Sequence, residues 1–229
     1  MSYLLSEKQS LVLQTVDRFG VLTSSQLTRF LKGKVSHVSV YDAKRKLVQL
    51  GFLSEEKLGR HLIIFIRPRG VSYLGSNLTT FTKLNYTLLN HTTVMNDCII
   101  ELLYQDKVDG AFPTFHTERE IRSNFIEQNF DLGDKKDPTK LKNIPERIPD
   151  FIIIEDGKRI AYEVELTQKA KKRYVRKFEL YRSQLLNNEY NMIVYLCASE
   201  STLEMIEKVL QELNMDPNHV RLELIDELI

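Results

Sequence analysis

Hydrophobic positions in the first part of the chain recur at helical spacing and predict three short helices. Ser6 opens a capping box ahead of the first helix, which ends at Gly20. Thr23 opens a second capping box, and Ser36 can cap a third helix over residues 37–50. The third helix carries an apolar stripe of Val40, Ala43, Leu47 and Leu50. Three helices this close together suggest a helix-turn-helix.

A hairpin is predicted directly after these helices. The apolar segments 52–53 and 61–66 flank a polar stretch, Pro68 ends the second strand, and residues 69–75 favour one more helical turn. This order of three helices and a hairpin resembles the winged helix of many bacterial regulators. The resemblance covers the first third of the chain and implies a DNA-binding domain over residues 1–80.

The rest of the chain, residues 81–229, predicts an α/β domain with a mixed sheet. Residues 127–147 are rich in charge, Gly and Pro and predict a long loop. Asp156-Gly157 is a strong signal for a two-residue hairpin turn. The predicted strands are 151–154, 160–166, 192–197 and 220–224, and the predicted helices are 84–105, 168–187 (capped by Thr167) and 201–213. Overall the fold class is α/β, or α+β for the two domains together.

Composition fits a folded, water-soluble chain. Of the 229 residues, 42% are hydrophobic and 28% are charged. No N-terminal signal peptide is recognisable, and no apolar run approaches the roughly 18 residues of a membrane span. We therefore expect a cytoplasmic protein without membrane contact. Cys98 and Cys197 stand in apolar surroundings and are expected to be buried free thiols.

Charge is distributed unevenly along the chain. Residues 1–80 hold 12 Lys and Arg against 5 Asp and Glu, whereas residues 81–148 and 149–229 are net acidic. The basic balance of the first domain is typical of a polyanion binder. A second basic cluster lies in the acidic part, at Lys169, Lys171, Lys172, Arg173, Arg176, Lys177 and Arg182. Phosphate contact and a merely solvated helix face explain this cluster equally well.

The winged-helix interpretation assigns DNA contacts to the third helix and the hairpin. Four side chains at the start of the helix would enter the major groove: Ser36, His37, Ser39 and Tyr41. Three cations would hold phosphates: Lys44, Arg45 and, at the tip of the hairpin, Arg60. The alternative is a winged helix that serves dimerisation, and a homodimer is compatible with either use.

Three acids in the predicted hairpin carry the candidate chemistry. If Glu155 and Lys158 close the turn, Asp150 lies directly opposite Glu163, with Cβ atoms about 5 Å apart. Glu165 projects from the same face, and that face is otherwise apolar. Facing carboxylates in a buried strand need a cation or a shared proton, and a divalent cation with oxygen ligands is the natural candidate. The alternative is a solvated hairpin face.

The order of motifs resembles the PD-(D/E)XK nuclease fold. Pro149-Asp150 is followed by the hairpin, by Glu163-Val-Glu165 and by a basic helix with Lys177 and Tyr181 one turn apart. With the N-terminal winged helix, with His91 to Asn96 and with Thr117-Glu-Arg119, the chain looks like the replication-relaxation proteins of plasmids and integrative elements. One residue departs from the motif: Glu165 stands where the nucleases have Lys.

This resemblance implies a role for each matching residue. Asp150 and Glu163 would bind Mg²⁺ or Mn²⁺ at the scissile phosphate, and Glu165 would orient water or a second metal. Candidates for phosphate contact are Gln168, Lys169, Lys177 and Tyr181. The first hypothesis is therefore a DNA-binding protein of a mobile genetic element with a nuclease-like domain, whose catalytic version would be a metal-dependent endonuclease that hydrolyses a phosphodiester with metal-activated water. The rival is a non-catalytic accessory or regulatory factor for replication, transfer or transcription, with other proteins of the same element as partners.

Overall fold

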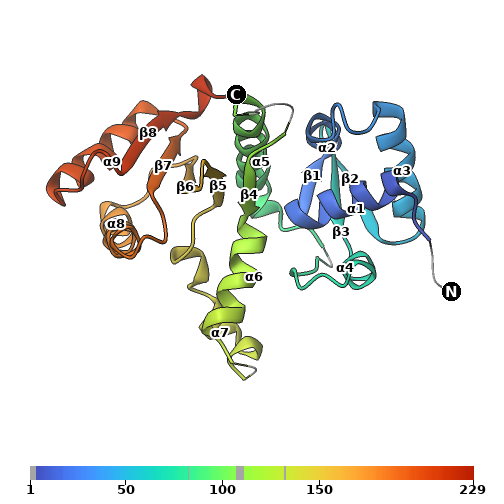
Figure 1. Cartoon of the computed structure of the whole chain (residues 1–229), viewed down its shortest axis with the longest axis horizontal. Helices are drawn as coiled ribbons and strands as arrows, with labels where there is room; N and C mark the ends of the chain where they lie inside the picture. Colours follow the sequence, from blue (N-terminus) through green and yellow to red (C-terminus); the bar gives the residue numbers. More distant parts are fainter. Residues whose placement is uncertain (1–3, 82, 107–110, 132) are drawn as a thin grey trace. The chain divides into compact units, whose positions relative to one another are not determined.

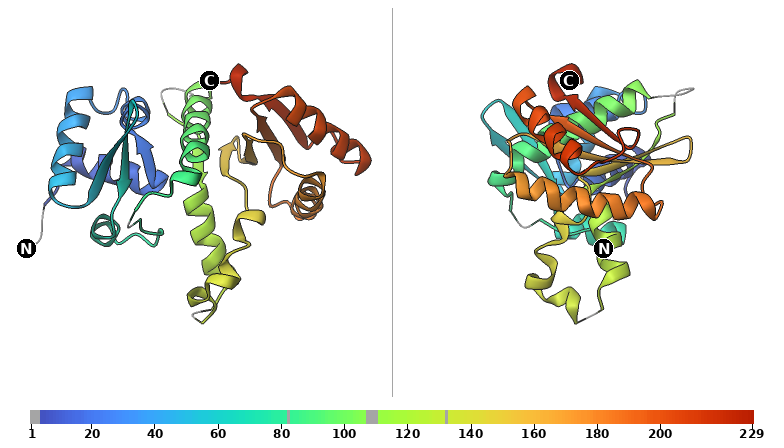
Figure 2. Two further views of the ribbon diagram at one scale, coloured as in Figure 1. Left: turned by 180° about the vertical axis from the view of Figure 1, so that it is seen from behind. Right: turned by 90° about the vertical axis from the view of Figure 1, so that its left-hand side faces the viewer.

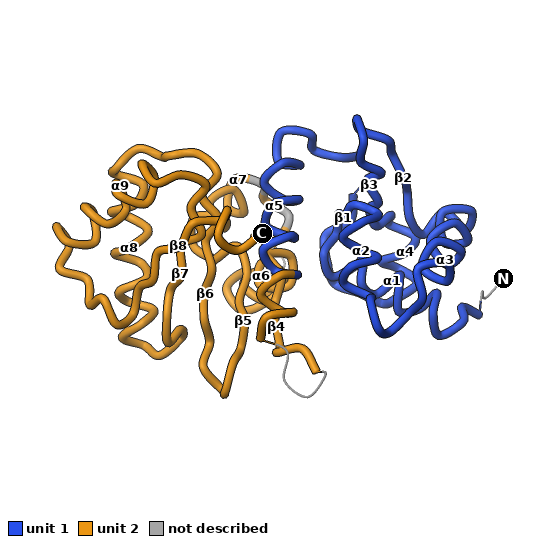
Figure 3. The backbone as a smooth tube through the Cα atoms, turned by 90° about the horizontal axis from the view of Figure 1, so that it is seen from above, with its two compact units in different colours: residues 1–100 blue, residues 101–229 orange. Residues whose placement is uncertain are grey.

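The computed structural model describes residues 4–81, 83–106, 111–131 and 133–229. Helices and strands form two compact units, Met1–Ile100 and Glu101–Ile229 (Figures 1 and 3). Both units combine helices with a sheet, so the mixed α/β class is confirmed. No helix among the described residues is long and apolar enough to cross a bilayer.

Of the four short helices in unit 1, the first three begin where the sequence provides a side-chain cap, and the fourth begins at Pro68. The helices are α1 (Glu7–Phe19), α2 (Ser24–Phe30), α3 (His37–Gln49) and α4 (Pro68–Leu74). Ser6 and Thr23 each complete a capping box, and the Ser36 side chain accepts from the backbone N–H of Ser39. The predicted starts of the first three helices are thereby confirmed.

Unit 1 also contains a three-stranded antiparallel sheet. Its strands are β1 (Val21–Thr23), β2 (Leu53–Leu58) and β3 (His61–Ile66), in the order β1-β3-β2. Leu58 pairs with His61, so Gly59 and Arg60 form the tip of the predicted hairpin. The strand β1 was not expected, because three residues between two capped helices leave no room for a visible alternation.

The long helix α5 (Tyr86–Gln105) crosses the boundary between the units. Leu84 and Leu89, before and in its first turn, pack in one apolar cluster with Val21, Ile63 and Phe65. Further along, the Asn96 side chain donates to the carbonyl of Val21 at 2.8 Å. Residues 81–100 consequently belong to unit 1, twenty residues beyond the boundary expected from the sequence.

A five-stranded mixed sheet forms the centre of unit 2. Its strands are β4 (Thr114–Thr117), β5 (Phe151–Glu155), β6 (Lys158–Glu165), β7 (Met192–Cys197) and β8 (Val220–Leu224), in sequential order. The pairs β4–β5 and β5–β6 are antiparallel, whereas β6–β7 and β7–β8 are parallel. The central position of β6 confirms that a strand apolar on both faces is a buried one.

Helices α6 (Glu118–Asn129), α8 (Lys171–Leu186) and α9 (Glu200–Glu212) contribute to one apolar core with the sheet. Ile152, Ala161 and Ile193 provide the sheet side of that core, and Phe178 of α8 packs against them. In Figure 2 the orange helix α8 runs across this face of the sheet. Cys98 and Cys197 are both buried free thiols, as expected.

Two expectations about unit 2 were wrong. Residues 127–147 are not one long loop: α6 reaches into their start and ends at Asn129, and α7 (Pro138–Leu141) follows between the short 3₁₀ helices Asp134–Lys136 and Ile144–Glu146. The side chain of Thr117 accepts from Glu120, which is a capping box that the sequence already contained. Helix α8 starts at Lys171 with Ala170 as N-cap, so Thr167 does not cap it.

Gly70 in α4 is expected to be intolerant of any side chain. A Cβ atom there would lie 2.5 Å from the carbonyl oxygen of Phe52 and 2.7 Å from Cδ1 of Ile66. Gly70→Ala should lower the free energy of unfolding by about 1–3 kcal/mol, because backbone has to shift to relieve the overlap. Urea unfolding measures the loss, and Ser72→Ala at an exposed position of the same helix is the control. Equal stability of the two variants would contradict the close approach.

Candidate functional site

The predicted hairpin register is confirmed and brings Asp150 beside the candidate acids. Glu155 pairs with Lys158, and the regular pairing runs to Phe151 opposite Tyr162. Asp156 and Gly157 have φ values of 48° and 76°, as a type I′ turn requires. Just beyond the paired strands, Oδ2 of Asp150 accepts the backbone N–H of Val164 at 2.7 Å.

Glu163 lies at the centre of a buried network of hydrogen bonds. Its residue is 7% exposed, and its Oε1 lies 2.9 Å from Nζ of Lys177. The hydroxyl of Tyr181 donates to the same oxygen. Burial raises the pKa of the Glu163 carboxyl, and the Asp150 carboxylate adds to that rise, whereas Lys177 and Tyr181 oppose it. A lysine therefore holds the carboxylate that the resemblance assigned to a metal.

Lys177 binds more than its carboxylate. Its Nζ donates to the carbonyl of Ile148 at 2.7 Å and reaches the carbonyl of Pro145 at 3.5 Å. Both carbonyls belong to the segment that leads into Asp150. One ammonium thus connects α8, the central strand β6 and the segment before β5. Three acceptors are the full hydrogen-bonding capacity of an ammonium group.

Glu165 forms an ion pair with a second lysine, Lys169. The residue is 3% exposed, and Oε1 lies 2.7 Å from Nζ of Lys169. The backbone N–H of Lys169 donates to the hydroxyl of Tyr174 at 2.9 Å, which positions that lysine. Lys169 was expected to contact phosphate, and in this arrangement its charge neutralises Glu165.

Tyr195 joins these acids and was not foreseen from the sequence. It pairs with Glu163 in the parallel register of β6 and β7 and is 1% exposed. Its hydroxyl has no hydrogen-bond partner within the described part of the chain. Burial, followed by the charges of Glu163, Glu165 and Asp150, raises the pKa of Tyr195 well above the ordinary value, so the hydroxyl keeps its proton. Only the register with the neighbouring strand could have revealed this contact.

The acids in this arrangement do not fit a divalent metal ion. Across residues 4–81, 83–106, 111–131 and 133–229, no group of three or more His, Cys, Asp or Glu side chains could hold a metal. The ammonium groups of Lys177 and Lys169 stand where a cation would have to bind Glu163 and Glu165. The predicted Mg²⁺ or Mn²⁺ would have to displace both ion pairs in order to bind these Oε1 atoms.

The second basic cluster is largely compensated by acids. Lys171 pairs with Glu212 at 2.6 Å, and Arg173 and Arg176 approach Glu146 at 3.9 and 3.4 Å. Arg182 donates to a backbone carbonyl, that of Leu213. Gln168 is exposed at the start of this region. These ion pairs lie at the surface and each adds little to stability, so phosphate contact by this cluster stays a prediction.

In unit 1, the start of α3 presents an exposed row of side chains. Ser36, His37 and Tyr41 are exposed, and Ser39 is half-buried and accepts a hydrogen bond from Lys8 at 3.2 Å. Val38, which is 67% exposed, was not among the predicted contacts. Its position off the buried stripe of Val40 and next to the predicted contact His37 was the available signal.

Lys44 differs from the other predicted phosphate contacts. The residue is only 4% exposed, its ammonium forms an ion pair with Glu55 of β2, and it donates to Oγ of Ser24 at 3.3 Å. A phosphate contact through Lys44 would require this buried pair to open. Arg45 and Arg60, by contrast, are exposed, and Arg45 lies 3.7 Å from the carboxylate of Asp42, which is exposed as well.

Two residues that supported the family resemblance have structural roles. Asn96 is 1% exposed and binds the carbonyl of Val21. Thr117 is the N-cap of α6.

No protein-family model, no curated protein and no solved structure matches this chain. The replication-relaxation resemblance therefore stays a prediction.

Lys177→Met should destabilise the protein in a pH-dependent manner. The variant leaves Glu163 buried without its ammonium partner, which costs about 3 kcal/mol of unfolding free energy at neutral pH. A buried acid with a raised pKa loses stability as the pH rises above its unfolded pKa, so the deficit should shrink towards about pH 4.5. Urea unfolding across this pH range measures it.

The double variant Glu163→Gln with Lys177→Met is the matched control. It removes both charges and should recover most of the loss and most of the pH dependence, since no buried charge is left unpaired. If Lys177→Met is as stable as the wild type at every pH, the ion pair does not have the role assigned to it.

Proposed function

We propose that this chain is a DNA-binding protein in which unit 1 binds duplex DNA as a winged helix. The order of elements, α1-β1-α2-α3-β2-β3, with the sheet order β1-β3-β2, supports this assignment. In such a domain the third helix enters the major groove and the β2–β3 hairpin is the wing. Arg60 at the hairpin tip and Arg45 on α3 then contact the phosphates.

The observation that carries the proposal is the division of α3 into two faces. Val40, Ala43 and Leu47 are buried in unit 1. The opposite face exposes His37 and Tyr41, the latter by 52%. Exposed polar and aromatic side chains on a helix that is anchored by its other face can reach base edges, and Val38 beside them suits the methyl group of thymine.

Electrostatics support the same surface. Residues 1–100 hold 13 Lys and Arg against 6 Asp and Glu, whereas residues 101–229 hold 19 against 25. Even with Lys44 engaged by Glu55, a net positive charge remains on unit 1 for a polyanion. Lys32 and Lys34 are exposed in the turn just before α3 and extend this charge.

For unit 2 we propose a nuclease-like fold that serves an accessory role without hydrolysing DNA. The sheet with three antiparallel strands, a crossing helix α8 and a parallel strand β7 supports the likeness to PD-(D/E)XK nucleases. The ion pairs of Glu163 and Glu165 with Lys177 and Lys169 favour the non-catalytic version. The likeness to replication-relaxation proteins supports an accessory or regulatory role in a mobile genetic element.

A metal-dependent endonuclease is the second candidate, and one observation favours it. Asp150 lies next to the Glu163 segment at the start of a hairpin, as the nuclease motif requires, and its charge contributes to the raised pKa of Glu163. An active form needs Lys177 and Lys169 to leave the carboxylates. In the structure both lysines hold their carboxylates.

Duplex binding is expected to depend on Arg45 and Arg60. Each phosphate contact contributes about −0.9 to the slope of log affinity against log salt, so the variant Arg45→Ala with Arg60→Ala should flatten the slope by about 1.8. Fluorescence anisotropy with a labelled duplex at several salt concentrations measures it.

Lys158→Ala with Lys208→Ala removes the same charge from exposed positions of unit 2 and should leave the slope unchanged. Equal slopes for the wild type and the unit 1 variant would overturn the assignment of the interface.

The accessory role predicts no DNA cleavage. Wild-type protein with millimolar Mg²⁺ or Mn²⁺ should leave supercoiled, single-stranded and branched DNA intact, and neither metal should raise the melting temperature, because a ligand stabilises only the fold that binds it. Nicking by the wild type that disappears in Asp150→Ala would instead establish the endonuclease. In that case Glu165→Lys, which restores the commoner motif, should retain or increase the activity.

A further inference from the structure

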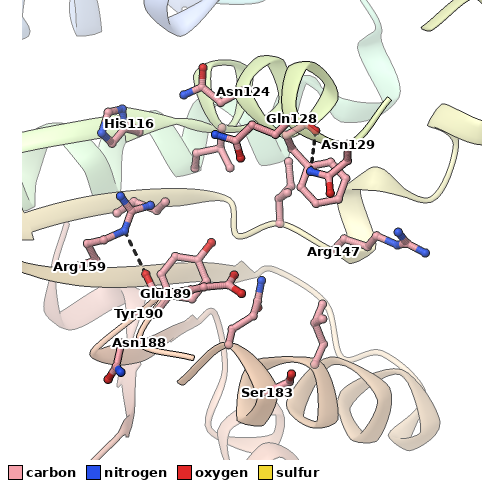
Figure 4. Close-up of a pocket in the computed structure, with 16 residues that line it drawn as sticks. His116, Asn124, Gln128, Asn129, Arg147, Arg159, Ser183, Asn188, Glu189 and Tyr190 are labelled. Atoms are coloured by element: carbon pink, nitrogen blue, oxygen red, sulfur yellow. Dashed lines mark hydrogen bonds between the residues drawn. The ribbon is translucent and has the colours of Figure 1, made fainter. Parts of the chain in front are cut away.

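A large polar pocket lies between α6, α8 and the sheet of unit 2, apart from the acids described above. Its volume is about 950 Å³, at the upper end of the range for ligand pockets. Figure 4 shows α6 on one side and α8 on the other, with the sheet between them. Asp150, Glu163 and Glu165 do not line it.

Two arginines line this pocket at well-separated positions. Arg159 from β6 and Arg147 from the segment before β5 lie towards opposite sides of the pocket in Figure 4. Nε of Arg159 donates to the backbone carbonyl of Glu189 at 3.0 Å, and the guanidinium lies 5.9 Å from the centre of the Tyr190 ring. These contacts hold Arg159 in place while its residue stays exposed. Guanidinium groups at both sides favour a ligand with more than one anionic group.

Amide side chains occupy the space between the arginines. Asn124, Gln128 and Asn129 come from α6 and are all exposed. Amides offer donors and acceptors that match the edges of nucleobases, and Asn129 already uses one donor for the carbonyl of Phe125 at 2.9 Å. The rings of Phe125 and Tyr190 also line the pocket and provide apolar surface for a base.

Gln184 gives an independent indication that the pocket takes a polar ligand. This residue of α8 lines the pocket and is only 9% exposed. Its Oε1 has no hydrogen-bond partner among the residues that the structure describes. A buried acceptor without a partner costs about 1–3 kcal/mol, and a turn of the amide towards the pocket would let a donor from a ligand remove that cost.

We propose that this pocket binds an unpaired stretch of nucleic acid, as a second site that is separate from the duplex-binding surface of unit 1. Phosphates bind Arg147 and Arg159, and a base between them meets the amides of α6 and of Gln184. A pocket of this kind admits bases that are splayed out of a stack, whereas a base-paired duplex keeps its bases inside. The separation of the arginines favours a strand over a single free nucleotide.

The test uses the full chain and a labelled oligothymidylate of about 12 nucleotides. In the double variant Arg147→Ala with Arg159→Ala, anisotropy should show strand binding that is at least about tenfold weaker. Each of the two substitutions removes a charged hydrogen bond to a phosphate. Duplex affinity should stay unchanged in this variant. Arg45→Ala with Arg60→Ala should show the reverse pattern, so failure of the duplex proposal and failure of the pocket proposal are distinguishable.

Gln184→Leu separates ligand binding from a structural role. The substitution replaces the acceptor by an apolar side chain of similar size, so the melting temperature should equal or exceed that of the wild type. Strand affinity should nevertheless fall. The control Lys158→Ala with Lys208→Ala removes two cations outside the pocket and should bind the strand as the wild type does.

Three outcomes would overturn the proposal. The first is strand affinity that is unchanged in both the arginine and the Gln184 variants. The second is an equal loss of strand and duplex binding in the arginine variant, which would indicate non-specific charge. The third is displacement of the strand by thymidine 5′-monophosphate at the concentration at which the oligonucleotide itself competes, which would make the pocket a free-nucleotide site.

Discussion

Unit 2 is organised around the buried ion pair between Lys177 and Glu163. The carboxylate belongs to the central strand, and the ammonium comes from the helix that covers the sheet. The same ammonium fixes the carbonyls of Pro145 and Ile148 and thereby the entry into β5. A charge pair in a core has to make its hydrogen bonds in full, since the desolvation of each ion costs several kcal/mol. Strand, helix and the incoming segment can therefore take only positions that complete this set.

Unit 1 contains a smaller version of the same arrangement. Lys44 of its third helix turns inwards to Glu55 of the neighbouring strand. In both units a lysine expected at a nucleic-acid surface neutralises a strand carboxylate instead. Counting charges along a sequence overstates the surface charge whenever helices carry lysines on the side that faces a sheet. The exposed arginines at 45, 60, 147 and 159 are better indicators of where phosphate can bind.

Local chemistry explains which features could be predicted from the sequence. The capping boxes at Ser6 and Thr23 and the turn at Asp156-Gly157 depend on neighbouring residues alone, and the structure confirms them. The hairpin register follows from the turn, so the position of Asp150 was also accessible. Other features depend on how α8 and β7 pack on the sheet. They are the lysine partners of Glu163 and Glu165, the position of Tyr195 and the pocket that Gln184 lines. No spacing within one segment encodes that packing. Helix α6 is different, since its capping box was present in the sequence and was overlooked.

The continuous helix α5 has a consequence for how this chain can be divided. Its first turns complete the apolar cluster of unit 1, while its last residues already count towards unit 2. Cleavage after residue 80, the boundary expected from the sequence, would remove Leu84 and Leu89 from the apolar cluster of unit 1. Val21, Ile63 and Phe65 of its sheet would then be exposed to water. A fragment that keeps the core of unit 1 intact therefore has to include the first turns of α5.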